Sequence, residues 1–316
     1  MWRSVVIPAP GSATGRLRLG LAGMDGVRRG TLVVLPGRAE FIEKYEEAAA
    51  DFCRRGFAVA VVEWRGQGLS LRGQSMPQRG FVGDYEEYLQ DLAAVLGELR
   101  SLAAPVPWIV LGHSMGGHIA LRWLYREPGT FAAAVMTAPM FGIPLAGVPE
   151  PMARLLCSAA VRLGRGHDYA PGQGDFSVER CRYEGNPLTS CPGRFETYRG
   201  LVAGRPDLIV GGATWGWLDA SLRSIAITRR PGYLESIETP ILLCLATEER
   251  VVSNAAIAMF ARRLPNARLE RFAGARHELL IERDAIRDRV LAAIDAFLDP
   301  AAPPLSPARA AEPQPA

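Results

Sequence analysis

The clearest chemical signal in the sequence is a serine with a glycine two positions before it and another two positions after it, in Gly112-His113-Ser114-Met115-Gly116. A short apolar run precedes this motif, and a helical pattern of apolar residues follows it. A serine at a sharp turn between a strand and a helix is exposed for nucleophilic attack, and larger side chains at the flanking positions would clash there. The motif therefore predicts that Ser114 is the nucleophile of an acyl-transfer reaction.

A serine hydroxyl becomes a good nucleophile only when a base takes its proton and an acid orients that base. Of the four histidines, His277 is the best candidate because it follows a predicted strand, residues 268–272, at the strand end where sites of open parallel sheets gather. The acid is expected between the serine and the histidine in chain order, after the preceding strand. Glu248 and Glu249 stand together at that place, and their positions alone leave both open.

An acyl-transfer site also needs hydrogen-bond donors for the oxyanion, commonly the backbone amide after the nucleophile and one from a loop after an earlier strand. The amide of Met115 is expected to be the first donor. Residues 35–40, Leu-Pro-Gly-Arg-Ala-Glu, form the loop that offers the second, and we select the backbone amide of Arg38. The same loop is also compatible with a plain turn into the following helix.

Other kinds of active site find no support in the sequence. Lys44, the only lysine, does not belong to a phosphate-binding P-loop, and residues 66–68 lack the third glycine of a dinucleotide-binding motif. No cluster of cysteine and histidine has the spacing of metal ligands. We therefore expect neither a cofactor nor a metal ion.

The composition is that of a globular protein of 316 residues, 48% hydrophobic and 22% charged. The net charge of +3 is spread without a dense basic run, which argues against nucleic acid as a partner. No apolar run approaches the roughly 18 residues of a membrane-spanning helix, and the first residues do not form a signal peptide, so a cytoplasmic protein is expected. The five scattered cysteines are expected to be reduced, and only a pairing of Cys181 with Cys191 is left open.

The spacing of apolar residues predicts an α/β fold with a mostly parallel central sheet flanked by helices. Residues 1–139 form the first part of this core, beginning with two alternating segments that indicate an antiparallel edge. Residues 140–232 carry helices between loops rich in Gly and Pro, which we interpret as an inserted helical cap. The alternation of strands and helices resumes in residues 233–299. The Pro/Ala-rich tail, residues 300–316, is expected to be disordered.

Individual elements follow from the same patterns. The strands are predicted at residues 4–8, 17–21, 31–35, 57–62, 108–112, 131–138, 240–246 and 268–272. The main helices are predicted at residues 41–52, 84–99, 117–125, 154–163, 194–202, 218–227 and 286–297. Asp84 followed by Glu87 indicates a capping box at the start of the second of these helices.

Several separate blocks of the sequence resemble the α/β-hydrolase fold and, within it, the lysophospholipase and monoacylglycerol lipase group, also called the serine aminopeptidase S33 or hydrolase-4 family. Besides the serine motif, the matching blocks are residues 36–45, 63–70, 81–85, 186–189 and 214–218. The resemblance spans about residues 15–298 and is closest to the bacterial lysophospholipase L2 branch.

The resemblance implies a catalytic triad of Ser114 as nucleophile, His277 as base and Glu249 as acid. It also implies that the backbone amides of Arg38 and Met115 bind the oxyanion. The expected reaction is hydrolysis of a carboxylic ester through an acyl-enzyme, without a cofactor.

Two departures from the group bear on this reading. Most members have Asp at the position of Glu249; glutamate is one methylene longer and can still reach the histidine, but the choice between it and Glu248 stays open. The lipase branch has His-Gly where this chain has Pro36-Gly37, which favours a lysophospholipid over a monoacylglycerol as substrate.

Within the predicted cap, Phe195, Trp215, Trp217 and Leu218 are candidates for lining an acyl tunnel, although the same residues would suit an ordinary helical core. The expected partner is a small amphiphilic lipid ester, and such a substrate suggests transient docking through the cap at the inner face of the membrane, with arginines near the lipid phosphates. Alternative functions are a monoacylglycerol lipase, a general carboxylesterase, an acyltransferase and a catalytically silent binding protein. Head group, acyl-chain length and oligomeric state are left open.

Overall fold

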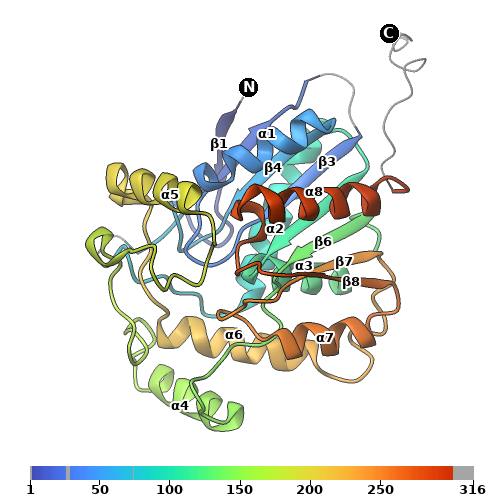
Figure 1. The fold of residues 1–316 in the computed structure, drawn as a ribbon. Coiled ribbons are helices and arrows are strands. Elements are labelled where there is room, and N and C mark those ends of the chain that lie inside the picture. The colour runs from blue at the N-terminus through green and yellow to red at the C-terminus, as the bar shows by residue number, and fades with distance from the viewer. Residues whose placement is uncertain (1, 26–28, 74, 302–316) are drawn as a thin grey trace, which may run out of the picture.

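The computed structural model describes residues 2–25, 29–73 and 75–301, and an eight-stranded sheet lies at its centre (Figure 1). The strands are β1 (Arg3–Pro8), β2 (Arg16–Ala22), β3 (Gly30–Leu35), β4 (Phe57–Glu63), β5 (Trp108–His113), β6 (Ala133–Thr137), β7 (Ile241–Ala246) and β8 (Ala267–Phe272). Their order across the sheet is β1-β2-β4-β3-β5-β6-β7-β8. β2 pairs antiparallel with β1 and with β4, and the other neighbours are parallel. The predicted α/β architecture with an antiparallel edge is confirmed.

The central strands are buried on both faces, and the edge strands are not. Every residue of β3, β4, β5, β6 and β7 is buried. Strands covered by helices on both faces need continuous apolar runs rather than alternation. At the two edges, only Ile7 of β1 and Phe272 of β8 are buried. These burial patterns explain why the sequence shows alternation at its start and apolar runs further on.

Helices cover both faces of the sheet. They are α1 (Glu46–Arg54), α2 (Tyr85–Ser101), α3 (Met115–Arg126), α4 (Glu150–Arg162), α5 (Pro192–Gly204), α6 (Trp215–Thr228), α7 (Asn254–Arg263) and α8 (Asp284–Leu298). α1 and α8 lie side by side on one face and α2 and α3 on the other (Figure 1). Buried Arg287 of α8 pairs with Asp51 of α1, and Nε of Arg55, the residue directly after α1, lies 2.8 Å from Asp295 Oδ2 of α8. These ion pairs hold together helices that are far apart in the chain.

Two predicted helix starts can be compared directly with the structure. The capping box of α2 is confirmed, because the Asp84 side chain accepts from the Glu86 amide at 2.9 Å and the Glu87 side chain accepts from the Asp84 amide. The predicted helix at residues 41–52 is instead a short 3₁₀ helix, η1 (Ile42–Tyr45), followed by α1. Apolar spacing alone does not separate these two tight helices.

Between β6 and β7 the described chain adds no strand to the sheet and contains α4, α5 and α6. α6 packs on the helices that cover the sheet: Ser221 Oγ lies 3.0 Å from Tyr85 OH of α2, and Trp217 joins the main core. α4 packs in turn on α6 through Cys157 and Leu222. Assigning residues 140–232 to a cap stays a prediction, and the predicted disordered tail lies outside the described residues beyond Ala301.

Candidate active site

Ser114 lies at the turn between β5 and α3, at the carboxyl end of a central strand. Its backbone φ of 51° and ψ of −115° are strained for a residue with a side chain, as at the turn that presents a nucleophilic serine. The flanking glycines permit this turn: a Cβ at Gly116 would lie 1.9 Å from the carbonyl oxygen of Leu35, and one at Gly112 would lie 2.6 Å from the Cα of Gly117. Close packing against β3 at Gly116 and against the start of α3 at Gly112 therefore explains the glycines of the motif.

His277 and Glu249 form a buried pair beside this turn. Nδ1 of His277 lies 2.8 Å from Oε2 of Glu249, and the two side chains are 5% and 0% exposed. Burial by itself raises the pKa of Glu249, but the hydrogen bonds from His277 and from the amides of Val251 and Val252 outweigh it and lower this pKa below its usual value. Glu248 is exposed, so Glu249 is the carboxylate that contacts the histidine.

Ser114 and His277 line one cavity of about 710 Å³. The serine is only 7% exposed, so a substrate reaches it through this cavity. In the described structure no hydrogen bond joins Ser114 Oγ to the His277 ring. Such bonds are often long or poorly aligned before substrate binds, and the shared cavity keeps the two groups available to the same ligand.

The loop at residues 36–40, which follows β3, packs directly against Ser114. A Cβ built on Gly37 would lie 3.2 Å from the Cβ of Ser114. The buried side chain of Gln67 holds this loop through two hydrogen bonds: its Oε1 accepts from the Ala39 amide at 2.6 Å, and its Nε2 donates to the Gly37 carbonyl at 3.1 Å. The loop is thus held at both sides of residue 38.

The backbone amides of Arg38 and Met115, both near Ser114, have no hydrogen-bond acceptor within the described part of the chain. The amides on either side of Arg38 are occupied, one by Glu40 and one by Gln67. The Met115 amide is free because the first amides of a helix have no intrahelical partner. Both predicted oxyanion donors are therefore available to an anionic oxygen.

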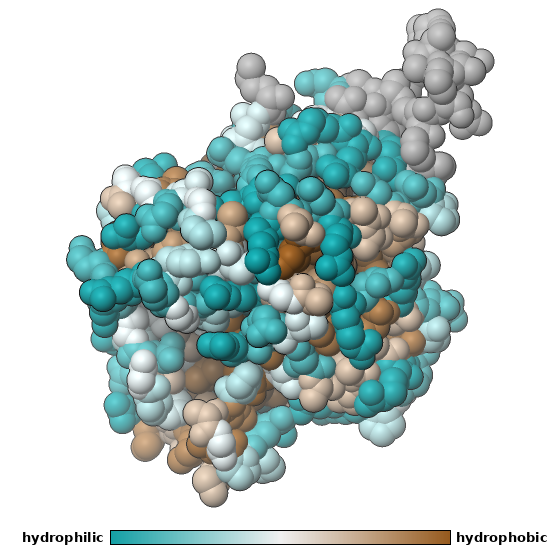
Figure 2. Space-filling view, in the orientation of Figure 1, coloured by the Kyte–Doolittle hydropathy of each residue, from teal (hydrophilic) through white to brown (hydrophobic). Residues whose placement is uncertain are grey.

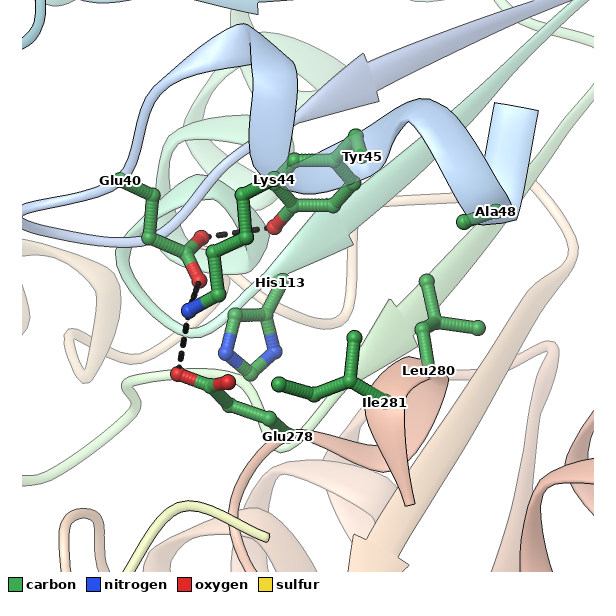
Figure 3. Close-up of a pocket in the computed structure, with 8 residues that line it drawn as sticks. All are labelled: Glu40, Lys44, Tyr45, Ala48, His113, Glu278, Leu280 and Ile281. Atoms are coloured by element: carbon green, nitrogen blue, oxygen red, sulfur yellow. Dashed lines mark hydrogen bonds and ion pairs between the residues drawn. The ribbon is translucent and has the colours of Figure 1, made fainter. Parts of the chain in front are cut away.

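A buried ion-pair network joins this loop to the segment that carries His277 (Figure 3). Lys44 Nζ lies 2.8 Å from Glu40 Oε1 and 2.6 Å from Glu278 Oε1. Tyr45 OH donates to the other oxygen of Glu40 at 2.6 Å. Because Glu278 directly follows His277, the ammonium of Lys44 couples the position of the loop to that of the histidine.

The charges of this network stabilise one another. Burial by itself would raise the pKa of Glu40, but the charge of Lys44 lowers it to about 2. Burial would lower the pKa of Lys44, and the two carboxylates raise it instead. Glu40, His113 and Glu278 bring possible metal ligands within 4.8 Å of one another. Since Lys44 already binds both carboxylates, these residues do not fit a metal ion.

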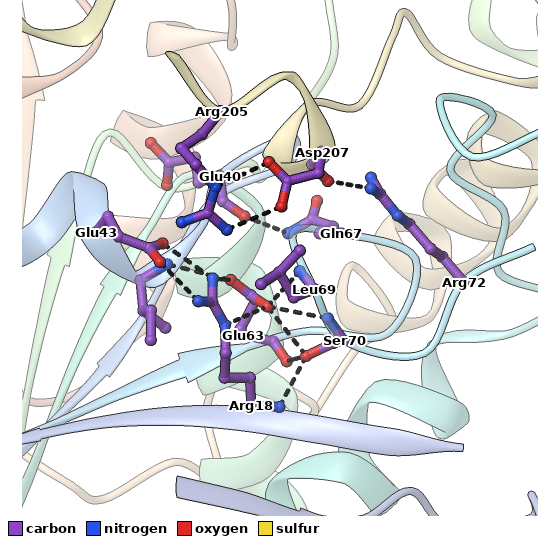
Figure 4. A network of polar contacts seen from close by, with 11 residues as sticks. Arg18, Glu40, Glu43, Glu63, Gln67, Leu69, Ser70, Arg72, Arg205 and Asp207 are labelled. Carbon is purple, nitrogen blue, oxygen red and sulfur yellow. Dashed lines mark hydrogen bonds and ion pairs between the residues drawn. The ribbon is translucent and has the colours of Figure 1, made fainter. Parts of the chain in front are cut away.

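A second buried network lies on the other side of the loop (Figure 4). The Glu63 side chain, at the end of β4, is fully buried and pairs with Arg18, whose Nε lies 3.0 Å from Glu63 Oε1. Arg18 also binds Glu43 of η1, with Nη1 2.6 Å from Oε1. Glu63 Oε1 accepts from the Ser70 amide at 2.9 Å, which fixes the turn that carries Gln67. The support of the loop thus extends to Arg18 on β2.

Of the four predicted substrate-binding residues, Trp215, Trp217 and Leu218 line the cavity. Phe195 is not among the residues that line this cavity: it is buried on α5, with its ring centroid 5.6 Å from that of Tyr183, and its role in substrate binding stays a prediction. Helical spacing does not distinguish a core aromatic from a cavity aromatic. Wall residues that the sequence did not single out include Ile143, Leu145, Val148, Leu156, Phe176 and Val210. Of these, Leu156 belongs to the helix predicted at residues 154–163, and no motif or periodicity distinguishes these six residues from ordinary apolar positions.

The other histidines have different surroundings. His113 lines the cavity, but its Nδ1 lies 3.1 Å from the Thr137 carbonyl oxygen, and burial lowers the pKa of His113 to about 4. His118 is buried against α6, and His167 does not line the cavity. Only His277 is paired with a carboxylate in the described residues. Cys181 and Cys191 do not pair, and no disulfide joins any of the cysteines in the described structure.

Comparisons with known proteins match this architecture. The family model described as serine aminopeptidase, S33 matches residues 26–284. The chain is 36% identical over 279 residues to lysophospholipase L2 of Escherichia coli K12, covering 85% of the chain and 80% of that protein. It is 32% identical over 272 residues to the probable lysophospholipase L2 of Haemophilus influenzae, covering 86% and 84%.

Among solved structures, a soluble variant of monoglyceride lipase from Saccharomyces cerevisiae, in complex with a substrate analog, aligns with a TM-score of 0.74 at 15% identity. The alignment covers 95% of this chain and 97% of that one, which shows a shared fold. The chain therefore belongs to the serine aminopeptidase S33 family, has the α/β-hydrolase fold, and is a carboxylic ester hydrolase.

Proposed function

We propose that the protein removes the fatty-acyl chain of a lysophospholipid through an acyl-enzyme on Ser114. The observation that carries this proposal is the cavity that Ser114, on its strained turn, shares with the hydrogen-bonded pair of His277 and Glu249. A hydroxyl, an imidazole and a carboxylate are the three groups that acyl transfer by a serine requires.

In the first half of the proposed reaction, Nε2 of His277 takes the proton of Ser114 as its oxygen attacks the ester carbonyl carbon. Glu249 accepts a hydrogen bond from Nδ1, which holds this tautomer and stabilises the imidazolium that forms. The backbone amides of Arg38 and Met115 donate to the oxyanion. When the intermediate collapses, the ester C–O bond breaks, His277 gives its proton to the glycerol oxygen, and the acyl group stays on Ser114.

In the second half, water attacks the acyl-enzyme. His277 takes a proton from this water and then returns it to the oxygen of Ser114 as the acyl bond breaks. The products are a free fatty acid and a glycerophosphodiester. No cofactor is needed, because each proton that leaves one oxygen is delivered to another by the same imidazole.

The volume and lining of the cavity support a single-chain lipid as substrate. Its volume of about 710 Å³ falls in the usual range of small-ligand sites, about 300–1,000 Å³. Trp215, Trp217 and Leu218 contribute to a largely apolar wall that suits one acyl chain. The relatives named lysophospholipase L2 favour a lysophospholipid over a neutral monoacylglycerol.

A fluorophosphonate probe with intact-mass analysis tests the nucleophile. The native protein and the control variant Ser101→Ala, changed at an exposed serine at the end of α2, should each gain one adduct. Ser114→Ala should gain none and should lose turnover by orders of magnitude while remaining folded. An undiminished adduct on Ser114→Ala would refute the assignment.

A lipid panel tests the substrate. Rates on lysophosphatidylcholine, monoacylglycerol and nitrophenyl esters, each with several chain lengths, separate the proposed lysophospholipase from a monoacylglycerol lipase and a general carboxylesterase. Adding an acceptor lipid reveals acyl transfer, because the fatty acid would then appear as a new ester. Faster turnover of monoacylglycerol than of lysophosphatidylcholine would contradict the proposed substrate.

We also propose transient docking of α4 on a membrane surface. Met152, Leu155 and Leu156 of α4 are 55%, 68% and 50% exposed, and Figure 2 shows hydrophobic side chains gathered at the lower edge of the molecule, where α4 lies in Figure 1. The exposed Arg154 and Arg162 of α4 would attract anionic lipids by about 1 kcal/mol each. Leu156 also lines the cavity, so a docked α4 would bring the lipid surface to its entrance.

Vesicle flotation tests this docking. None of the described helices is long and apolar enough to cross a bilayer, so binding would be peripheral. The native protein should float with phosphatidylglycerol-containing vesicles at low salt, and Leu155→Asp should float much less. Val6→Asp is the matched control, because Val6 is 58% exposed on β1. Equal flotation of both variants would contradict docking through α4.

A further inference from the structure

Arg38 is a cavity-lining arginine that has no acidic partner. Its Nη2 donates to the carbonyl oxygens of Gly211, at 2.9 Å, and Gly212, and its guanidinium carbon lies 5.0 Å from the centroid of the Trp217 ring. Across the described residues no Asp or Glu pairs with Arg38, and neither Nε nor Nη1 donates to any protein group. The cation therefore retains unused donors next to the cavity.

The fully buried arginines of the described chain differ in this respect from Arg38, which is half-buried. The buried arginines of the described chain each pair with a carboxylate, and they are Arg18, Arg29, Arg65 and Arg287. Burial of a charge is unfavourable without a charged partner, and it lowers the pKa of Arg38 to about 10, so the group remains a cation at neutral pH. A ligand anion would supply the missing partner.

The position of Arg38 suits an anion located a fixed distance from the reacting ester. Its backbone amide is the proposed donor to the oxyanion. The number of covalent bonds from this nitrogen to the guanidinium carbon equals the number from the ester carbonyl carbon to the phosphorus of a 1-acyl lysophospholipid. One residue can thus reach both ends of the glycerol unit. Arginine is well suited to phosphate because its hydrogen bonds to this anion are charge-assisted.

We propose that the guanidinium of Arg38 binds the phosphate of the lysophospholipid head group and so selects phosphate-bearing substrates over neutral ones. This inference rests on the proposed function, because it assigns the head-group contact of that same site. It assigns to the side chain of Arg38 a role separate from that of its backbone amide.

The test compares kcat/KM for lysophosphatidylcholine and for monoacylglycerol of the same acyl chain. Arg38→Gln keeps the backbone amide and can still donate to a carbonyl of the cap. It should lower kcat/KM for lysophosphatidylcholine by about 10- to 100-fold more than kcat/KM for monoacylglycerol, as expected for loss of a charge-assisted hydrogen bond to the phosphate. Arg72→Gln is the matched control: Arg72 also donates to carbonyls of this region, those of Ile209 and Asp207, but does not line the cavity. It should leave the ratio of the two substrates unchanged.

The outcomes separate this inference from the proposed function. An equal loss on both substrates, or none, would show that Arg38 is only a tether to Gly211 and Gly212 and would overturn the inference, while turnover of lysophosphatidylcholine by the native protein would leave the proposed function standing. A native protein that prefers monoacylglycerol would refute both. Inorganic phosphate is added as a competitor of monoacylglycerol hydrolysis: inhibition at millimolar phosphate that is lost in Arg38→Gln, together with an unchanged preference between the two lipids in that variant, would reassign the site to free phosphate and overturn the head-group role.

Discussion

Replacing Lys44 by methionine should reveal the strength of the network that supports the active site. Its ammonium contacts Glu40 and Glu278 at 2.8 and 2.6 Å, and the side chains are 9%, 5% and 8% exposed in that order. Methionine has a similar length, so the substitution removes mainly the charge. Removal of one partner from a buried ion pair costs about 3–5 kcal/mol. We expect the free energy of unfolding to fall by that amount near neutral pH.

The loss should depend on pH, because it comes from two carboxylates left without a cation. In the native protein the pKa of Glu40 is held at about 2, so its stabilising contribution is complete above the pKa of the unfolded chain, about 4.3, and is lost only as the pH falls toward 2. In Lys44→Met, burial and repulsion raise a carboxylate pKa above the unfolded value, so protonation stabilises the folded state. Each unit of that pKa difference contributes about 1.4 kcal/mol. The deficit should therefore shrink by about 1–3 kcal/mol between about pH 8 and pH 5.

Urea unfolding followed by tryptophan fluorescence measures both effects. The double variant Lys44→Met/Glu278→Gln removes a second charge and should recover much of the loss at about pH 8. Arg54→Met is the control, because Arg54 pairs with Asp51 but its side chain is 68% exposed, and a pair of that kind contributes at most about 1 kcal/mol. The reasoning would be refuted if the loss of unfolding free energy in Lys44→Met were the same at both pH values. It would also be refuted if the loss in the double variant equalled the sum of the losses in Lys44→Met and Glu278→Gln.

Three further outcomes follow from the geometry. Glu249→Gln should lower kcat by about 10³- to 10⁴-fold and Glu248→Gln by less than about 2-fold in steady-state hydrolysis, because only the former carboxylate contacts His277; equal effects would contradict the assignment of the acid. The pKa of Glu249 is lowered in the folded protein, so the ionised carboxylate stabilises the folded state. This contribution is complete above the pKa of glutamate in the unfolded chain, about 4.3, and is lost as the pH falls below it. The unfolding free energies of Glu249→Gln and the native protein should therefore converge in acid. Gly68→Ala should lower the free energy of unfolding by about 2–4 kcal/mol in urea, because residue 68 has a φ of +51° and a Cβ there would lie 2.2 Å from the Glu63 carboxyl carbon. As a control, an added Cβ at Gly73 meets open space, so Gly73→Ala should change the free energy of unfolding by less than about 1 kcal/mol.

The sequence alone indicated the features that arise from short segments. The turn at Ser114 is local, since its flanking glycines and the elements before and after it are contiguous. The capping box at Asp84 and the buried runs of the central strands are local for the same reason. The order of strand ends also directed attention to His277, because in a parallel sheet the carboxyl ends of the strands meet at one edge.

Tertiary structure decided what depends on direction and on distant partners. Glu248 and Glu249 are adjacent and chemically alike, and only the turn after β7 determines which of them faces His277. Phe195 and Trp217 both suit helical packing, but only the second lies at the cavity.

The same limit explains why the supporting network and the unpaired arginine were not foreseen. Lys44 and Glu278 are 234 residues apart, and no periodicity or motif links positions so distant. The absence of a carboxylate beside Arg38 is likewise a property of everything packed around it. Local preferences specify turns and elements over a few residues, whereas pairing of buried charges depends on which surfaces the folded chain brings together, and that information resides only in the complete tertiary arrangement.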